Sequence, residues 1–237
     1  MNIDHVLMVA RKELKEIAKN KGSWISAVFF ALFFAVTNIG SVVSSAQPGI
    51  PVSIDWYVIY LSLFIGVFSG FMLCGTVFFR EKQSGVVETL LCTPLSLRSI
   101  WLGKVLGVAI PSYILALFSA GVLGVLSVLS VSAVAAPSLL VVLHLLVIAP
   151  LFTAAAVGII GYIQLAMGMR ENRIVSMGIF ILLIAGLSVS TGVVQGNASL
   201  VNTVVLTLLV AAVLLFSLSF LLSKRLNKEK IVTTIPD

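Results

Sequence analysis

The sequence predicts an all-α membrane protein from its composition, the length of its apolar runs and the placement of its charges. Of its 237 residues, 59% are hydrophobic and only 10% are charged, and the mean hydropathy is +1.16. A soluble domain of this size does not have such a composition. The runs are apolar on all sides rather than alternating with polar residues, which excludes a transmembrane β-barrel and indicates helices.

Six apolar runs are long enough to cross a bilayer, whose hydrocarbon core of about 30 Å needs roughly 20 helical residues. We expect a single transmembrane domain over 24–222, preceded by a cytoplasmic helix (1–23) and followed by a basic cytoplasmic tail (223–237). The predicted spans are about 24–43, 57–79, 105–129, 139–168, 174–194 and 203–222.

The positive charges predict the orientation of these spans. All fifteen Lys and Arg residues lie before the first run, between the second and third, between the fourth and fifth, or after the sixth, whereas the other loops contain a single charge, Asp55. Because cytoplasmic loops are enriched in Lys and Arg, we expect a multi-pass protein of the cell (plasma) membrane with both termini in the cytoplasm. The net charge of +6 favours contact with anionic membrane lipid, and no basic groove indicates nucleic acid as a partner.

The first run has one rival interpretation, a cleaved signal peptide, because Ser44-Ser45-Ala46 has the small-x-small form of a cleavage site. We favour a membrane span. The run is about 20 residues long rather than the 7 to 15 of a signal core, and the segment before it contains acidic residues.

The N-terminal segment predicts an amphipathic helix at the membrane surface. Apolar residues recur on one helical face at Ile3, Val6 or Leu7, Ala10, Leu14 and Ile17. Charged residues occupy the remaining arc: Arg11, Lys12, Glu13, Lys15, Glu16 and Lys19. Such a helix suits the headgroup plane, where its simplest role is to anchor and orient the first span.

The densest charged segment, 80–104, lies between the second and third runs, and we expect it to lie in water. It predicts two short helices with a break between them. Glu81, Gly85 and Glu88 recur at i, i+4 and i+7, so both carboxylates are expected on one face. Gly85 can relax the backbone between them.

Pro94 is predicted to end the first of these helices, because it pushes Thr93 toward extended geometry. Ser96 is a candidate N-cap for a helix that runs through Arg98 and Lys104 into the third span. The result would be a charged bend in the chain, here called the elbow, over residues 80–104 at the cytoplasmic end of the bundle.

The same segment resembles the signature of ABC-2 type transporter permeases: an acidic residue, a Gly, a second acidic residue, then Leu-Leu-x-Thr-Pro-x-Ser and a closing Gly-Lys. The residues that carry this resemblance are Arg80, Glu81, Gly85, Glu88, Leu90, Leu91, Thr93, Pro94, Ser96, Arg98, Gly103 and Lys104. The stretch Val9-Ala10-Arg11-Lys12-Glu13-Leu14 also resembles the opening of these permeases.

The resemblance implies a coupling helix, over 85–93, that sits in a groove of a separate ABC ATPase. Contact with the ATPase is then expected of the surrounding signature residues: Glu81, Gly85, Glu88, Thr93, Pro94, Arg98, Gly103 and Lys104. The opening helix, with Arg11, Lys12 and Glu13, is implied to touch it as well. Two ATPases carrying ATP and Mg would dock below two permease chains, making this chain a half-transporter in a homodimer, or in a heterodimer with a similar permease.

ATP hydrolysis is not expected on this chain, and neither is a cofactor of its own. Gly103-Lys104 has the last Gly-Lys of a phosphate-binding loop, but Arg98 stands where its first Gly should be and Val105 where its Ser or Thr should be. Nor do His5, His144, Cys74 and Cys92 form a ligand cluster or a disulfide framework, so no metal site is predicted.

A short loop between the fourth and fifth spans holds Arg170, Glu171 and Arg173. It is either a second ATPase contact or a charge cap at the membrane edge. Within the second span, Ser62, Gly66, Gly70 and Cys74 form a stripe of small residues at four-residue steps, which predicts close helix packing within the chain or a dimer seam.

We therefore expect a non-catalytic permease that exports a small amphiphile, lipid-like molecule, glycan or ion, with no residue identified for substrate binding. An intramembrane enzyme is the first alternative. It is disfavoured because the predicted spans carry no Asp, Glu, Lys or Arg and because His144 stands alone; a histidine there is more often hydrogen-bonded within the bundle than a ligand. A non-transporting membrane subunit that assembles or senses is the second, and the sequence leaves it open.

Overall fold

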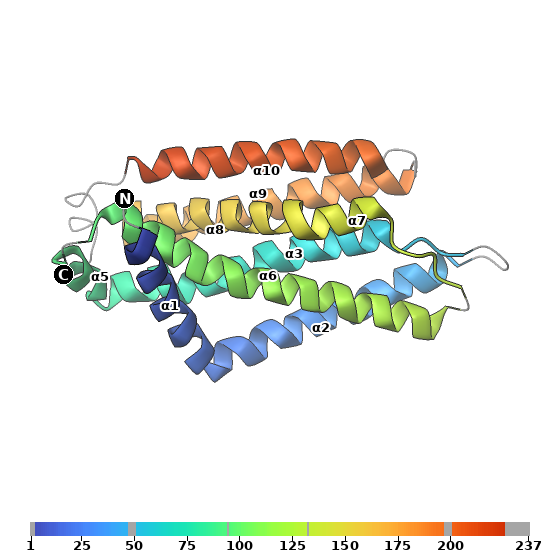
Figure 1. Cartoon of the computed structure of the whole chain (residues 1–237), viewed down its shortest axis with the longest axis horizontal. Helices are drawn as coiled ribbons and strands as arrows, with labels where there is room; N and C mark the ends of the chain where they lie inside the picture. The colour runs from blue at the N-terminus through green and yellow to red at the C-terminus, as the bar shows by residue number, and fades with distance from the viewer. Residues whose placement is uncertain (1–2, 47–50, 94, 132, 197–200, 226–237) are drawn as a thin grey trace.

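The computed structural model describes the chain except residues 1–2, 47–50, 94, 132, 197–200 and 226–237 (Figure 1). The regular elements of the described residues are helices, and the one β-bridge among them, between Val52 and Val134, is isolated. This confirms the predicted all-α class. In chain order the elements are α1 (Ile3–Lys19), α2 (Lys21–Ser44), α3 (Asp55–Cys74), η1 (Gly75–Phe79), α4 (Arg80–Gln83), α5 (Val86–Leu91), α6 (Leu97–Ser130), α7 (Leu139–Leu143), η2 (His144–Ile148), α8 (Ala149–Ala166), α9 (Met169–Gly196) and α10 (Val201–Ser223).

Five helical segments of the described chain are long and apolar enough to cross a membrane, which makes this a multi-pass membrane protein. They are Lys21–Ser44, Asp55–Gln83, Leu97–Ser130, Leu139–Ala166 and Val201–Ser223. The sixth predicted span, 174–194, falls in α9, whose stretch Ile174–Ser188 is apolar but too short by itself. The sixth span therefore stays a prediction.

Two spans continue past their predicted ends. The second runs through η1 and α4 to Gln83, and the third begins at Leu97 rather than at 105. Both extensions carry charged residues of the segment 80–104, which the hydropathy pattern places outside the membrane. The helices continue there because they pack on each other and on α1, so the charged elbow is confined to a short stretch between them.

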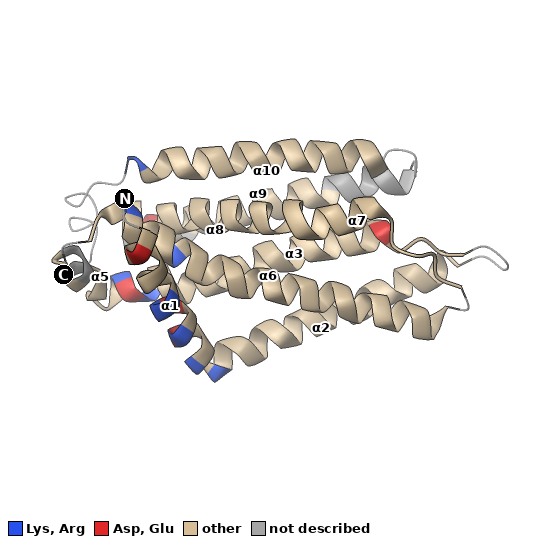
Figure 2. Cartoon of the chain, viewed as in Figure 1, with Lys and Arg blue, Asp and Glu red and all other residues tan. Residues whose placement is uncertain are grey.

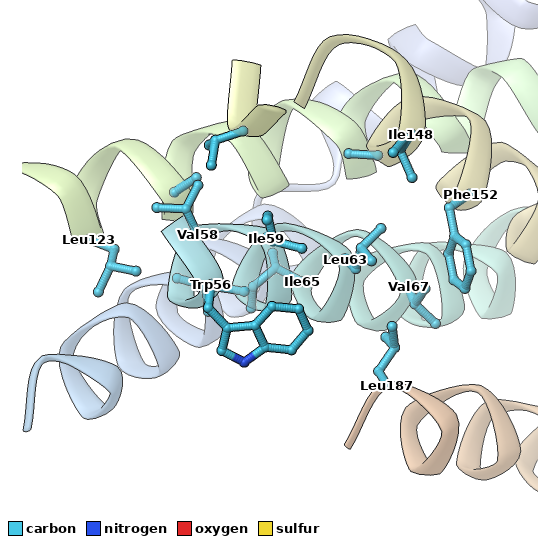
Figure 3. Packing of buried hydrophobic residues seen from close by; sticks show 14 of the residues in the cluster. Trp56, Val58, Ile59, Leu63, Ile65, Val67, Leu123, Ile148, Phe152 and Leu187 are labelled. Atoms are coloured by element: carbon cyan, nitrogen blue, oxygen red, sulfur yellow. The ribbon is translucent and has the colours of Figure 1, made fainter. Parts of the chain in front are cut away.

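Helix α3 lies at the centre of the bundle, against α6, α8 and α9 (Figure 3). Its side chains Trp56, Ile59, Leu63 and Val67 belong to the same buried cluster as residues from those neighbours. Helices α2 and α10 lie at the edge and expose large apolar side chains, as expected where lipid is the solvent. Packing against α3 thus fixes the positions of α6 and α8.

The stripe of small residues on α3 faces α6 and α8 of the same chain. A Cβ added to Gly70 would lie 2.8 Å from Val157 Cγ2, and Cys74 Sγ is 3.8 Å from the Val157 carbonyl oxygen. Gly66 similarly approaches Thr153. Of the two predicted roles, close packing and a dimer seam, the observed contacts are those of packing within one chain.

Candidate functional site

Charged residues gather at one end of the bundle, where α1, α4 and α5 lie beside the start of α6 (Figure 1, Figure 2). Helix α1 crosses this end and packs against α6, while α2 turns away from it along the bundle. The end combines the N-terminal helix and the elbow, the two segments that the sequence analysis singles out. They meet in space although about 70 residues separate Lys12 from Glu81 along the chain.

Two glycines bring α1 and α6 into close contact. A Cβ at Gly103 would lie 2.5 Å from Val9 Cβ and 2.9 Å from the Val6 carbonyl oxygen, and a Cβ at Gly107 would lie 2.6 Å from Glu13 Cβ. This four-residue repeat of glycine on α6 lets the backbone of α1 approach closely. The close approach in turn carries Glu13 into the protein interior.

Helix α1 packs part of its predicted apolar face against the bundle and leaves part of it exposed. Val6, Ala10 and Ile17 are buried as expected, but Ile3 and Leu7 are 68% and 56% exposed. Helix α1 instead buries Val9 and the charged Glu13. The reason is electrostatic: a carboxylate can leave water when cationic partners meet it inside.

An ionic cluster of Glu13, Glu81, Lys104 and Lys12 forms where the helices meet. Lys104 Nζ donates to Glu13 Oε1 at 2.8 Å and to the Glu81 carboxylate. The side chains of Lys104 and Glu13 are each 1% exposed, and that of Glu81 is 11% exposed. One ammonium group on α6 therefore holds α1 and α4 together.

Lys12 supplies the second positive charge of the cluster from the rim. Its Nζ lies 3.0 Å from Glu81 Oε1 and 3.3 Å from Glu13 Oε1, and 3.4 Å from Glu16 Oε1. Burial opposes the charged form and lowers the pKa of Lys12, but the neighbouring carboxylates outweigh burial and raise that pKa above its ordinary value. Lys12 is thus positively charged at neutral pH.

Lys82 makes a second buried connection, which the sequence analysis did not identify. Its side chain is fully buried, and Nζ donates to the carbonyl oxygens of Leu165, at 3.0 Å, and Met167, at 2.6 Å. These carbonyls lie at the C-terminal end of α8, where backbone acceptors lack partners within the helix. Adjacent residues of α4 therefore bind in two directions, Glu81 to α1 and α6 and Lys82 to α8.

The expectation that segment 80–104 lies wholly in water is wrong for three of its charges. Glu81, Lys82 and Lys104 are all buried. Charge alone predicts exposure, because an isolated buried ion is costly. Here each charge finds an opposite charge or a helix-terminal carbonyl.

The expectation that Glu81 and Glu88 share one helical face is also wrong. Helix α4 ends at Gln83, α5 begins at Val86, and Gly85 between them has φ +71°. Glycine adopts this left-handed conformation without the strain that a side chain would add. Gly85 was expected only to relax one helix that ends at Pro94, but the structure interrupts the helix at Gly85 itself.

The remaining residues of the predicted elbow are placed as follows. Ser96 caps α6, as predicted, because its Oγ accepts from the Ser99 backbone nitrogen at 3.2 Å. Arg98 is exposed on the first turn of α6, and Thr93 is half-buried. The side chain of Glu88 and all of Pro94 lie outside the described residues, as do the side chains of Arg170 and Arg173; Glu171, on the first turn of α9, is exposed.

The three carboxylates Glu13, Glu16 and Glu81 each place an oxygen within 4.8 Å of the others, a spacing that a metal ion could use. The ammonium groups of Lys12 and Lys104 already contact those oxygens. The arrangement is therefore that of an ion-pair network rather than of a cation site.

His144 lies away from this end, within the bundle. It is buried, and its Nε2 is 3.2 Å from Ser62 Oγ on α3. This is the hydrogen-bonded structural role that the sequence analysis favours for a lone histidine over that of a ligand.

Comparison with known families gives a match. A sequence model described as ABC-2 family transporter protein matches residues 11–187. The matched region contains every member of the ionic cluster and the elbow. No curated protein matches the chain significantly.

Proposed function

Because this chain belongs to the ABC-2 transporter family, we propose that it is the permease subunit of an ABC exporter driven by ATP hydrolysis on separate ATPase subunits. Chains of this family are generally non-catalytic membrane components that work with such ATPases. On this proposal the basic end of the bundle faces the cytoplasm, two permease chains pair, and one ATPase docks below each. The cargo is a small amphiphile, lipid-like molecule, glycan or ion.

The observation that carries the proposal is a set of buried polar contacts that connects α4 to α1, α6 and α8 directly beside the elbow. The ionic cluster ties α4 to α1 and α6, and Lys82 ties α4 to the end of α8. Helix α5 follows α4 after the break at Gly85. A partner that binds α5 would therefore act on α4, and the contacts of Glu81 and Lys82 would pass its movement to α1, α6 and α8.

The buried charges keep these helices from sliding past one another. Apolar surfaces can slip past one another at little cost, whereas separating Lys104 from Glu13 or Glu81 leaves a buried charge without its partner. We propose that closure of the ATPases moves α5, that the ionic cluster transmits the movement as a unit, and that the membrane cavity then changes the side to which it opens. ATP and Mg act on the ATPase chains.

The experiment places the chain in lipid nanodiscs with a candidate ABC ATPase and compares ATP hydrolysis with and without the permease. Thr89→Arg alters an exposed position of α5, and Ser45→Arg is the matched control at an exposed position of the opposite end. We expect the α5 variant to lose co-purification and permease-dependent hydrolysis, and the control to keep both. Equal behaviour of the two variants, or no effect of the wild-type permease on any plausible ATPase, would contradict the proposal.

A further inference from the structure

A cleft of about 460 Å³ lies between the end of α1, the first turn of α2 and the foot of the second span. It is distinct from the ionic cluster, although it shares Glu81 with it. Its apolar wall consists of Ile17, Leu73 and Val77. Charged and polar side chains, including Lys19 and Arg80, line the rest. Such a combination suits a ligand that is part charged and part apolar.

The charges of the cleft are not balanced. Its carboxylates, Glu16 and Glu81, both pair with Lys12, and Glu81 also pairs with Lys104. Its cations, Lys19 and Arg80, form no ion pair among the described residues of the chain. The cleft therefore presents two positive charges that form no ion pair among the described residues, while both of its carboxylates already contact ammonium groups. Glu13, Glu16 and Glu81 together still exceed Lys12 and Lys104 by one negative charge.

The apolar wall extends from the charged mouth toward the middle of the bundle. Leu73 precedes Arg80 by seven residues along a helix that is continuous through η1, which corresponds to a distance of about 10 Å at the usual rise. Thr76 and Val77 belong to η1, and a π-helical turn of this kind often occurs at a functional site. A headgroup at the mouth would place the first carbons of an acyl chain against the edge of this wall, because Ile17, Leu73 and Val77 are each 3–4% exposed.

Polar groups at the mouth offer little besides charge for recognition. The hydroxyl of Thr76 donates to the Leu73 carbonyl and that of Ser84 to the Glu81 carbonyl. The side-chain oxygen of Asn20 accepts from the Ser23 backbone nitrogen, which leaves the amide nitrogen of Asn20 as a donor. One Arg, one Lys and one amide donor form a set that matches phosphate oxygens.

We propose that this cleft binds the phosphate headgroup of an anionic membrane amphiphile, with Arg80 and Lys19 on the phosphate and the acyl portion along Leu73 and Val77. Binding needs no ATPase, so it is tested separately from the proposed transport function. A water-soluble phosphate has the same headgroup chemistry but no acyl portion, and the test distinguishes the two.

The test is native mass spectrometry of the full chain released from detergent that contains phosphatidylglycerol, phosphatidylcholine or glycerol 3-phosphate. Lys19→Gln/Arg80→Gln removes the two cations of the cleft. Arg11→Gln/Lys15→Gln is the matched control, because it removes two exposed cations that line the outer face of α1 instead. Lys19→Arg/Arg80→Lys retains the charge and checks that the site tolerates substitution.

We expect the wild-type chain to retain phosphatidylglycerol in preference to phosphatidylcholine, and the cleft variant to bind phosphatidylglycerol about tenfold more weakly or worse. The control and the charge-retaining variant should stay within about twofold of wild type, and glycerol 3-phosphate should not compete. Equal losses in the cleft variant and the control would mean general surface attraction and would overturn the proposal. Competition by glycerol 3-phosphate at the same concentration would overturn the amphiphile as the ligand.

Discussion

The basic end and the middle of the bundle join helices by different means. In the middle, α3 meets α6 and α8 through small residues and apolar side chains, as at Gly70 and Val157. At the basic end, α4 meets α1, α6 and α8 through buried charges. The first kind of contact fixes distance, and the second also fixes which groups face each other. On the proposed function, this second kind of contact is the one that transmits the movement of the ATPases.

Removing one partner of the ionic cluster should have the largest effect. Lys104→Met leaves the carboxylates of Glu13 and Glu81 buried with only Lys12 at the rim to oppose their charge, so we expect the free energy of unfolding to fall by about 3–5 kcal/mol. Chemical unfolding in detergent micelles measures this loss. A change of less than about 1 kcal/mol would mean that the cluster is hydrated rather than buried.

Closing the space between α1 and α6 should have the next largest effect. Gly103→Ala brings a methyl group against Val9 and the backbone of Val6, which we expect to destabilise the protein by about 1–3 kcal/mol through overpacking. Gly121→Ala is the control on the same helix, because nothing lies within 4 Å of its added Cβ. The control should be neutral or stabilised by up to about 1 kcal/mol. Equal effects at both positions would contradict the close contact.

A polar contact in the middle of the bundle should matter less. Ser62→Ala removes the partner of His144 Nε2 and leaves that nitrogen buried. We expect a loss of about 1 kcal/mol in the free energy of unfolding, with no change in ATPase stimulation. A loss of stimulation at wild-type stability would show that coupling depends on the middle of the bundle as well.

The smallest effect is expected at the rim of the cluster. The side chain of Glu16 is 55% exposed, and its contact with Lys12 is an i, i+4 pair at 3.4 Å. Glu16→Gln should therefore change the free energy of unfolding by less than about 0.5 kcal/mol. A loss comparable with that of Lys104→Met would place Glu16 inside the cluster instead.

The fold class and five spans were predictable because long apolar runs have few structural alternatives in a chain with this composition. Ser96 as an N-cap was predictable because capping is local. The partners of Glu13, Glu81 and Lys104 were not, because the pairing depends on the tertiary approach of α1 to α6. Gly103 and Gly107, spaced four residues apart, were the available signal of that approach.

The burial of Lys82 also could not be predicted from the sequence. In the sequence, Lys82 is one of several charged residues that follow the second apolar run. Its charge alone predicts a solvent-exposed side chain. Its burial follows from where α8 ends, because the carbonyls of Leu165 and Met167 need donors there. No pattern within the segment 80–104 contains that information.

The central claim, that the ionic cluster transmits ATPase closure, is tested most directly by a variant that keeps the packing and removes the charges. Glu13→Met/Glu81→Met/Lys104→Met replaces the buried ions with apolar side chains, a change that is often neutral or stabilising. In nanodiscs we expect this variant to stay folded and to bind the ATPase while permease-dependent ATP hydrolysis falls to the basal rate. Hydrolysis at the wild-type rate by the folded, ATPase-bound variant would contradict the claim.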